Sequence, residues 1–351
     1  MVTVEKLDEV YMRVFGDPSI EQELVDFFTY EYPGARFTPQ YRARLWDGKV
    51  RLYDVVRKTI YVGLVSYIEE FATRNGYAVE YVNQVRHENG ITHEQVEGFA
   101  KVLKPMGRGQ PIEIRDYQVE AVKTALDKER SLLLSPTASG KSLIIYLLIR
   151  HYMNIVKGGR LLLIVPTTSL VEQMHSDFLQ YSQVDDSFGE HLMHRIYSGK
   201  EKDTMAPIVI TTWQSIYKLP KEWFADFKMV IGDEAHTFQA KSLTTIMEKL
   251  SQCPYRFGLT GTLDGTLTHR LVLEGVFGPV YQVTTTKALM DSDKLAKLDI
   301  KCLVMKYSDE ECKLVKDKTY AEEIDFIIAH QKRNNFIKNL AVDQTGNTLV
   351  L

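Results

Sequence analysis

The chain has 351 residues, of which 44% are hydrophobic and 25% charged, and its formal net charge is −3. This composition is typical of a soluble globular protein of two or three domains, and near-neutrality can hide a basic surface. Three cysteines without C-x-x-C spacing argue against a disulfide framework or cysteine-bound zinc, and no apolar run approaches the roughly 20 residues of a membrane span, so we expect a cytoplasmic protein with no membrane partner.

The first hundred residues mix short β-like runs with helical spacing. Strand patterns occupy 49–56, 59–65 and 77–82, and helical patterns occupy 21–28 and 65–75. We therefore expect a small α+β domain over 1–103. The Gly- and Pro-rich, basic stretch 104–111 that follows reads as a linker.

A basic segment inside this first domain, residues 35–58, carries seven Lys or Arg against two Asp, a local charge of +5. Four aromatic residues are interleaved with the charges, a combination that suits phosphate contact together with base stacking. The alternative is that the aromatics form the domain's core and the charges a solvated face. For Trp46 we expect a place in the core. The candidate nucleic-acid contacts are Arg42, Arg44, Trp46, Lys49 and Arg51.

From residue 115 onward, unbroken apolar runs alternate with helical spacing. Such runs are typical of a parallel sheet covered by helices on both faces, which predicts an α/β, doubly wound domain over 104–295. The predicted strands are 131–135, 160–166, 206–212, 228–234, 255–261 and 279–285, and the predicted helices are 141–154, 169–181 and 214–218.

The last segment, 296–351, combines one apolar run with a long stretch of helical spacing. We predict a strand at 300–307, helix over 318–344, and a strand beginning at 346. The final strand reads as the start of a further α/β unit, so we expect a linker followed by a truncated second domain, and hence a fragment.

The stretch "SPTASGKS" follows a predicted strand and precedes a predicted helix, as a phosphate-binding loop does. Backbone N–H groups at a helix N-terminus bind anions, a lysine reaches the phosphates, and a hydroxyl binds Mg²⁺. The alternative is a helix start with Ser139 as its cap and a solvated lysine, because Ser135 stands where such loops usually have Gly. The loop residues are Pro136, Thr137, Ala138, Ser139, Gly140, Lys141 and Ser142.

A second feature decides between these alternatives. The run "KMVIGDEAH" ends a buried strand on Asp233 and Glu234. The carboxyl ends of parallel strands meet at one edge of a sheet, so both carboxylates should face the loop. Asp233 and Ser142 could hold Mg²⁺ while Glu234 orients the attacking water, and Lys141 would stabilise the transferred phosphoryl group.

In addition, a series of motifs in order resembles the DEAH-type helicases of superfamily 2 over nearly the whole chain. The motifs are "RDYQ" (115–118), "SPTASGKS" (135–142), "VPTTSLVEQ" (165–173), "TTWQS" (211–215), "DEAH" (233–236), "GLTGT" (258–262) and "VFGPVYQVTT" (276–285). The resemblance implies a RecA-like fold that uses ATP and Mg²⁺. It further implies that Gln118 reads adenine, with Arg115 or Tyr117 packing near the base.

The same resemblance implies two further groups of residues. Sequence-independent contacts with a nucleic-acid strand would come from Thr167, Thr168, Thr211, Thr212 and Gln214. Coupling between ATP and that strand would come from His236, Thr260 and Thr262. Motifs IV to VI of the family, which include its arginine finger, are absent from the sequence.

Together these features predict an ATP-dependent DNA helicase or translocase acting on branched DNA in recombination and repair. We expect a monomer whose partners are branched DNA and the RNA of R-loops. An RNA helicase with the same motor remains open, because phosphate contacts do not distinguish the two polymers. So does a nucleic-acid-binding module without motor activity, although its site would be expected to lose Lys141 or Glu234.

Overall fold

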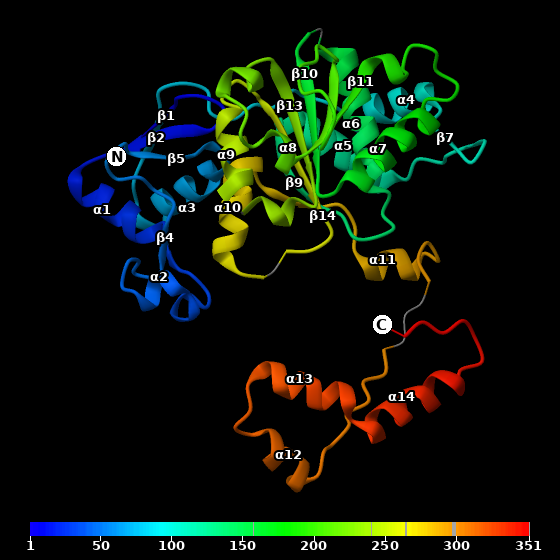
Figure 1. Cartoon of the computed structure of the whole chain (residues 1–351). Helices are drawn as coiled ribbons and strands as arrows, with labels where there is room; N and C mark the ends of the chain where they lie inside the picture. The colour runs from blue at the N-terminus through cyan, green and yellow to red at the C-terminus, as the bar shows by residue number, and fades with distance from the viewer. Residues whose placement is uncertain (157, 240, 264, 297–299, 351) are drawn as a thin grey trace. The chain divides into compact units, whose positions relative to one another are not determined.

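The computed structural model describes residues 1–156, 158–239, 241–263, 265–296 and 300–350 (Figure 1). These residues form two compact units, Met1–Ala296 and Lys297–Leu351. No helix in the described parts of the chain is both long and apolar enough to cross a bilayer.

The N-terminal part of the first unit is a small sheet with helices packed against it. Its strands lie in the order β5-β2-β1-β6, and of the three neighbouring pairs β1–β6 is parallel. Alternating residues of β1 (Val2 and Val4) and β2 (Met12 and Val14) point into a shared core with the helices. The elements are β1 (Val2–Lys6), β2 (Tyr11–Phe15), β5 (Thr59–Tyr61), β6 (Val79–Tyr81), α1 (Pro18–Phe27) and α3 (Val65–Asn75).

The basic segment extends from this sheet as a two-stranded ribbon and a short helix. The ribbon pairs β3 (Thr29–Glu31) with β4 (Lys49–Arg51), and α2 (Pro39–Arg42) lies between them in sequence. The strand predicted at 49–56 is therefore shorter than expected. The strand predicted at 59–65 also ends early, because residues 62–64 turn into a 3₁₀ helix that leads directly into α3.

The main sheet has seven strands, and each neighbouring pair is parallel, as the apolar runs predict. The order is β11-β12-β10-β13-β14-β9-β15. The edge strand β11 has no counterpart among the predicted strands. The strands are β9 (Arg130–Leu134), β10 (Arg160–Val165), β11 (Met193–Ile196), β12 (Ile208–Thr212), β13 (Phe227–Asp233), β14 (Tyr255–Thr260) and β15 (Val280–Gln282).

Helices cover both faces of this sheet, so its strands are apolar on both sides. Adjacent residues of β10, Leu161 and Leu162, enter the two different cores. One face carries α4 (His93–Leu103), α5 (Asp116–Lys128), α6 (Lys141–Ile155) and α7 (Thr168–Tyr181), and the other carries α8 (Trp213–Ile216), α9 (Lys241–Lys249) and α10 (Leu267–Phe277).

The predicted boundary at residue 103 lies after α4, whose buried residues pack with α5 and α6. By its packing α4 therefore belongs with the large sheet. The predicted linker 104–111 forms a small hairpin of β7 (Met106–Gly107) and β8 (Gln110–Pro111).

The small sheet is docked on α9 and α10 through close and polar contacts. Tyr11 and Tyr61 both donate to one Glu248 oxygen of α9, each at 2.9 Å. Glu274 of α10 is buried and accepts from Tyr67. Gly63 lies so near the α10 backbone that a Cβ on it would be 2.0 Å from the Glu274 carbonyl oxygen. The two parts of this unit therefore share a tightly packed interface.

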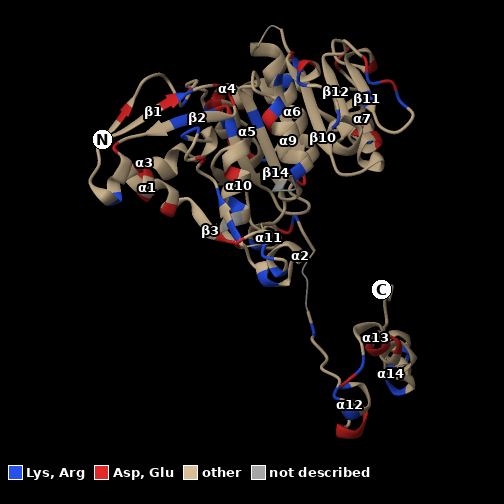
Figure 2. Cartoon of the chain, turned by 60° about the vertical axis from the view of Figure 1, so that its left-hand side comes forward, with Lys and Arg blue, Asp and Glu red and all other residues tan. Residues whose placement is uncertain are grey.

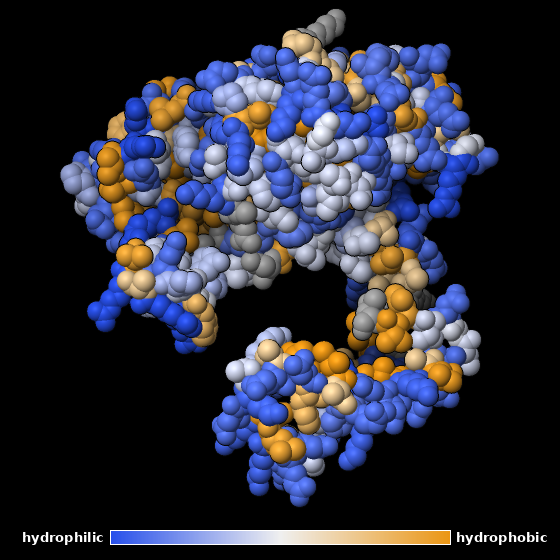
Figure 3. Space-filling view, viewed as in Figure 1, coloured by the Kyte–Doolittle hydropathy of each residue, from blue (hydrophilic) through white to orange (hydrophobic). Residues whose placement is uncertain are grey.

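The described residues of the second unit form three helices, α12 (Asp309–Val315), α13 (Tyr320–Ala329) and α14 (Gln331–Val342). The helix expected over 318–344 is interrupted at His330, and apolar side chains stay exposed on α13 and α14 (Figure 3). The predictions of strands at 300–307 and from 346 are wrong for the described residues of both segments. A strand needs a hydrogen-bonded neighbour, and neither segment has one there.

In the first unit, the short helix α11 (Thr286–Asp291) follows β15.

Candidate active site

The phosphate-type loop and the acidic pair meet at the carboxyl edge of the large sheet, as predicted. β14 lies between β9 and β13, so the residues that follow these strands are close neighbours. The Ser135 N–H donates to the Thr260 carbonyl at 2.8 Å, which ties the loop to the neighbouring strand.

Ser135, the residue that departs from the usual loop pattern, is fully buried and supports the loop from within. Its Oγ lies 2.6 Å from Ser139 Oγ, and the Ser139 hydroxyl donates to the Pro136 carbonyl at 2.6 Å. Ser139 does not cap α6, because the capping position is held by Gly140. The alternative of a simple serine-capped helix start is therefore wrong.

Gly140 has the backbone conformation and the crowding that require glycine. Its φ is +84°, and a Cβ there would lie 2.4 Å from Gln118 Nε2. Gln118 is itself buried: its amide donates to the Ser139 carbonyl at 2.8 Å and accepts from Arg115 N–H at 2.9 Å. In this structure Gln118 fixes the loop, and its contact with adenine stays a prediction.

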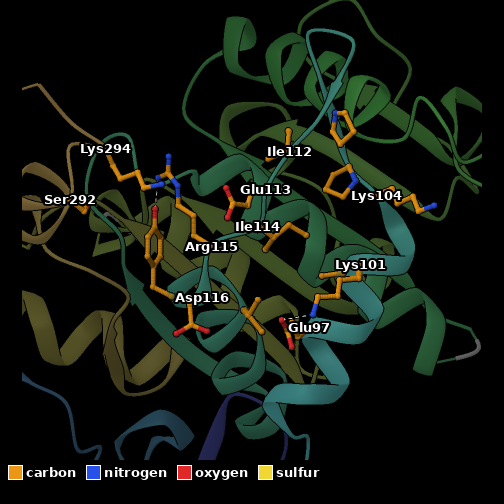
Figure 4. A pocket seen from close by; sticks show the side chains of 15 residues that line it. Glu97, Lys101, Lys104, Ile112, Glu113, Ile114, Arg115, Asp116, Ser292 and Lys294 are labelled. Atoms are coloured by element: carbon orange, nitrogen blue, oxygen red, sulfur yellow. Dashed lines mark hydrogen bonds and ion pairs between the residues drawn. The ribbon is translucent and has the colours of Figure 1, made fainter.

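Arg115 and Tyr117 hold the same loop from the side. Arg115 Nη1 donates to Tyr117 Oη at 2.5 Å and to the Ala138 carbonyl at 3.3 Å, and Tyr117 donates to Ser139 at 3.0 Å. A groove lies beside them, lined by α4, the segment 111–117 and residues near Lys294 (Figure 4). Arg115 and Tyr117 line this groove and also contact the loop.

Lys141 is paired across the site, not solvated. Its Nζ lies 2.9 Å from Glu234 Oε1, and the two side chains are only 19% and 33% exposed. Glu234 has φ +49°, an uncommon conformation for a residue other than glycine, and it follows directly on β13. Two motifs 93 residues apart in sequence thus place their charged groups in contact.

Asp233 is buried, and its Oδ1 has no hydrogen-bond partner among the residues that the structure describes. Burial raises the pKa of this carboxyl, while the positive charge of Lys141 lowers it. A buried carboxylate oxygen left unpartnered beside a phosphate-type loop fits a hard divalent cation such as Mg²⁺. The predicted second ligand, Ser142, begins the first turn of α6 together with Lys141.

The residues predicted to couple ATP to nucleic acid are connected to one another. His236 Nδ1 lies 3.0 Å from Thr260 Oγ1, and Thr260 donates to the Thr262 carbonyl at 2.9 Å. His236 also lies 3.4 Å from Glu234. Sequence reasoning missed His269 of α10, whose Nε2 lies 2.8 Å from the His236 carbonyl. A single histidine near the start of a helix does not indicate in the sequence that it will contact the ATP-site residues.

The residues predicted to contact a nucleic-acid strand fall into two groups. Thr167, Thr168 and Gln214 are exposed, and β10 and β12 align Val165 with Thr212, which brings their loops together. Thr211 and Thr212 are buried, so their side chains do not reach solvent in this structure, and their contact with a strand stays a prediction.

The hydroxyls of these two threonines are used inside the protein. Thr211 donates to the Ile196 carbonyl at 2.9 Å, and Thr212 Oγ1 lies 3.0 Å from Ser215 Oγ. For Thr211 the physical reason is the unpredicted strand β11, which pairs with β12 and makes it an interior strand.

In the basic segment, Arg42, Arg44 and Lys49 are exposed, and no carboxylate pairs with them among the described residues. Figure 2 colours the Lys and Arg residues of the chain blue and the Asp and Glu residues red. Arg51 pairs with Asp47. Trp46 is half-buried; its ring packs edge-on against Tyr32, and its Nε1 donates to the Lys49 carbonyl at 2.9 Å.

The remaining aromatics of this segment divide between core and surface. Tyr53 is buried in the core of the small sheet, whereas Phe37 and Tyr41 are exposed at 64% and 41%. The interpretation of the aromatics as a core is therefore correct for Tyr53 and wrong for Phe37 and Tyr41.

Comparison with known proteins extends these observations. The family model described as "DNA helicase UvsW, N-terminal" matches residues 2–82, and the model described as "Type III restriction enzyme, res subunit" matches residues 111–265. The ATP-dependent DNA helicase uvsW of Enterobacteria phage T4 is 36% identical over 339 residues, which are 95% of this chain and 66% of that protein. The DNA 3′-5′ translocase XPB2 of Sulfurisphaera tokodaii is 30% identical over 202 residues, 58% of this chain and 42% of that protein.

Two solved structures of the phage T4 UvsW helicase are also similar. One is 35% identical with a TM-score of 0.73 and covers 80% of this chain and 99% of its own. The other is 34% identical with a TM-score of 0.73 and covers 97% of this chain and 67% of its own. The chain spans just under two thirds of the length of the T4 curated relative and less of the translocase. The phosphate-type loop and the acidic pair lie within the matched residues 111–265, and the N-terminal sheet lies within the matched residues 2–82. The chain belongs to the UvsW family of superfamily 2 helicases.

Proposed function

We propose that this protein acts in an ATP-dependent DNA helicase or translocase that remodels branched DNA, such as forks, Holliday junctions and R-loops. We further propose that it acts as a monomer in the cytoplasm during recombination, replication and repair. The observation that carries the proposal is the meeting of Lys141, Glu234 and the unpartnered Asp233 oxygen at one sheet edge.

The chemistry follows from where these groups lie. The N-terminus of α6 presents backbone N–H groups to an anion, and Lys141 is a mobile positive charge that can leave Glu234 for a phosphate. Glu234, freed from the lysine, can orient water for attack. Asp233 and Ser142 would hold Mg²⁺, which when bound would neutralise charge on the phosphates.

The basic segment supports a nucleic acid as the partner. Its exposed Arg42, Arg44 and Lys49 lie in the same segment as exposed Phe37 and Tyr41, so phosphate contact and stacking on unpaired bases can occur together. That combination suits a junction of duplex and single strand better than a uniform duplex, whose bases are already stacked.

The test is ATP hydrolysis, and nucleotide binding beside it, with duplex, single-stranded and forked DNA and with RNA of matched length. Strongest stimulation by forked DNA is the expected result. Stimulation by RNA alone would support an RNA helicase instead. Nucleotide-dependent DNA binding without hydrolysis, in any form of the protein that carries both motor domains, would support a module without motor activity.

A further inference from the structure

The hydroxyl of Ser142 is held by a residue of another helix that no motif includes. Ser142 Oγ lies 2.8 Å from the Oη of Tyr181, near the end of α7. Both side chains are half-buried. The Tyr181 ring packs against Tyr146 of α6 with centroids 5.3 Å apart, so the position of its hydroxyl is fixed by packing on the same helix that carries Ser142.

Asp177 lies one turn before Tyr181 on the same side of α7. Burial raises the pKa of its carboxyl, and hydrogen bonds from Ser142 and Gln173 lower it. None of the described Lys, Arg or His residues forms an ion pair with Asp177. Ser142 therefore has two oxygen-bearing neighbours on α7, the Tyr181 hydroxyl and the Asp177 carboxyl group.

We infer that Tyr181 and Asp177 are positioning residues that orient the Ser142 hydroxyl toward the magnesium of a bound nucleotide. The inference rests on the proposed function, in which Ser142 binds Mg²⁺. A serine that gives an oxygen lone pair to a cation must direct its proton to another acceptor, and Tyr181 Oη and the Asp177 carboxylate are acceptors beside it.

Such outer partners set both the direction and the basicity of a ligand. Their loss typically lowers metal affinity by about 10- to 100-fold. The expected effect is therefore selective: the affinity for Mg²⁺ in the nucleotide complex should fall, whereas contacts of the loop backbone with the nucleotide should remain.

The test is a Mg²⁺ titration of residues 1–351 with a fluorescent ADP analogue, alongside binding of the same analogue in EDTA. Tyr181→Phe and Asp177→Asn should each raise the half-saturating Mg²⁺ concentration by about 10-fold or more, with binding in EDTA unchanged. Tyr77→Phe is the matched control, since it removes a hydroxyl that donates to Glu23 at 2.9 Å in the small sheet domain. It should leave the titration unaltered.

A double variant separates positioning from general packing. In a Ser142→Ala background, adding Tyr181→Phe should change the Mg²⁺ dependence no further, because its effect passes through Ser142. A wild-type titration in both single variants, or a further loss in the double variant, would overturn the inference. Should Tyr181→Phe fail to fold, Asp177→Asn carries the test alone. Wild-type protein with no Mg²⁺-dependent binding at all would overturn the proposed function, and this inference with it.

Discussion

The ATP-site edge of the large sheet and the basic segment of the small domain were predicted from similarly short stretches of sequence, yet they are built differently. At the sheet edge each charged group follows a buried strand, and its neighbours hold it: Lys141 contacts Glu234, and Ser135 is bonded within the loop. In the basic segment Arg42 and Arg44 extend from a short helix and the turn after it into solvent. Position at a sheet edge is fixed by the whole sheet, whereas a surface loop fixes little beyond its own backbone.

The largest effect that we expect is on the rate of ATP hydrolysis at the sheet edge when a second motor domain is not present. The described residues form one RecA-like sheet, and the family resemblance implies that the arginine finger comes from a second such domain. Residues 1–351 alone should therefore hydrolyse ATP about 10³- to 10⁵-fold more slowly than a form carrying both domains, with little stimulation by DNA. Steady-state phosphate release measures this. Robust DNA-stimulated turnover by residues 1–351 would place the finger within this chain.

The second prediction separates the two partners of the central ion pair. Lys141→Ala should abolish tight binding of Mg·ATP, because the mobile charge for the phosphates is lost. Glu234→Gln should keep binding and lower turnover by about 10²- to 10⁴-fold, since only the orientation of water is affected. Equilibrium binding and turnover are measured on both variants, the latter in a form that hydrolyses ATP. Near wild-type turnover in Glu234→Gln would remove this residue from the mechanism.

The third prediction concerns the interface that joins the two compared regions. Gly63→Ala should destabilise the unit by about 1–3 kcal/mol, because the new Cβ would meet the Glu274 carbonyl and neither backbone can move freely. Gly98→Ala in α4 is the control: nothing lies within 4 Å of its added Cβ, so no loss is expected. Thermal unfolding compares the two, and equal unfolding temperatures would mean that the docking is loose.

The smallest effects are expected in the basic segment. Joint replacement of Arg42, Arg44 and Lys49 by Gln should weaken DNA binding and flatten its salt dependence, by about 0.9 in the log–log slope per lost phosphate contact on duplex. Extending the replacement to Arg51 should add less, because Arg51 pairs with Asp47.

The control for these charge replacements is Arg13→Gln, which removes a charge paired with Glu5 elsewhere in the same domain. Binding is measured over a range of salt concentrations. An unchanged slope in the joint variant would make the segment a solvated face without a role in DNA contact.

The sequence alone determined the parallel sheet and the edge at which the site lies. Unbroken apolar runs between helices leave few arrangements other than a doubly wound sheet, and loop residues after its strands must share one edge. The bounds of α3 also agree with the pattern, because its apolar spacing and the glycine after Asn75 are local signals.

Tertiary structure decided what depends on residues far apart in the chain. Thr211 is buried because β11 lies beside β12, and residues 300–307 form no strand because no neighbour pairs with them. The contact of Tyr181 with Ser142 likewise arises only where α6 and α7 pack together. Periodicity reports which face of an element is apolar, but burial and hydrogen bonding depend on the element beside it, and that neighbour is set by the folded chain.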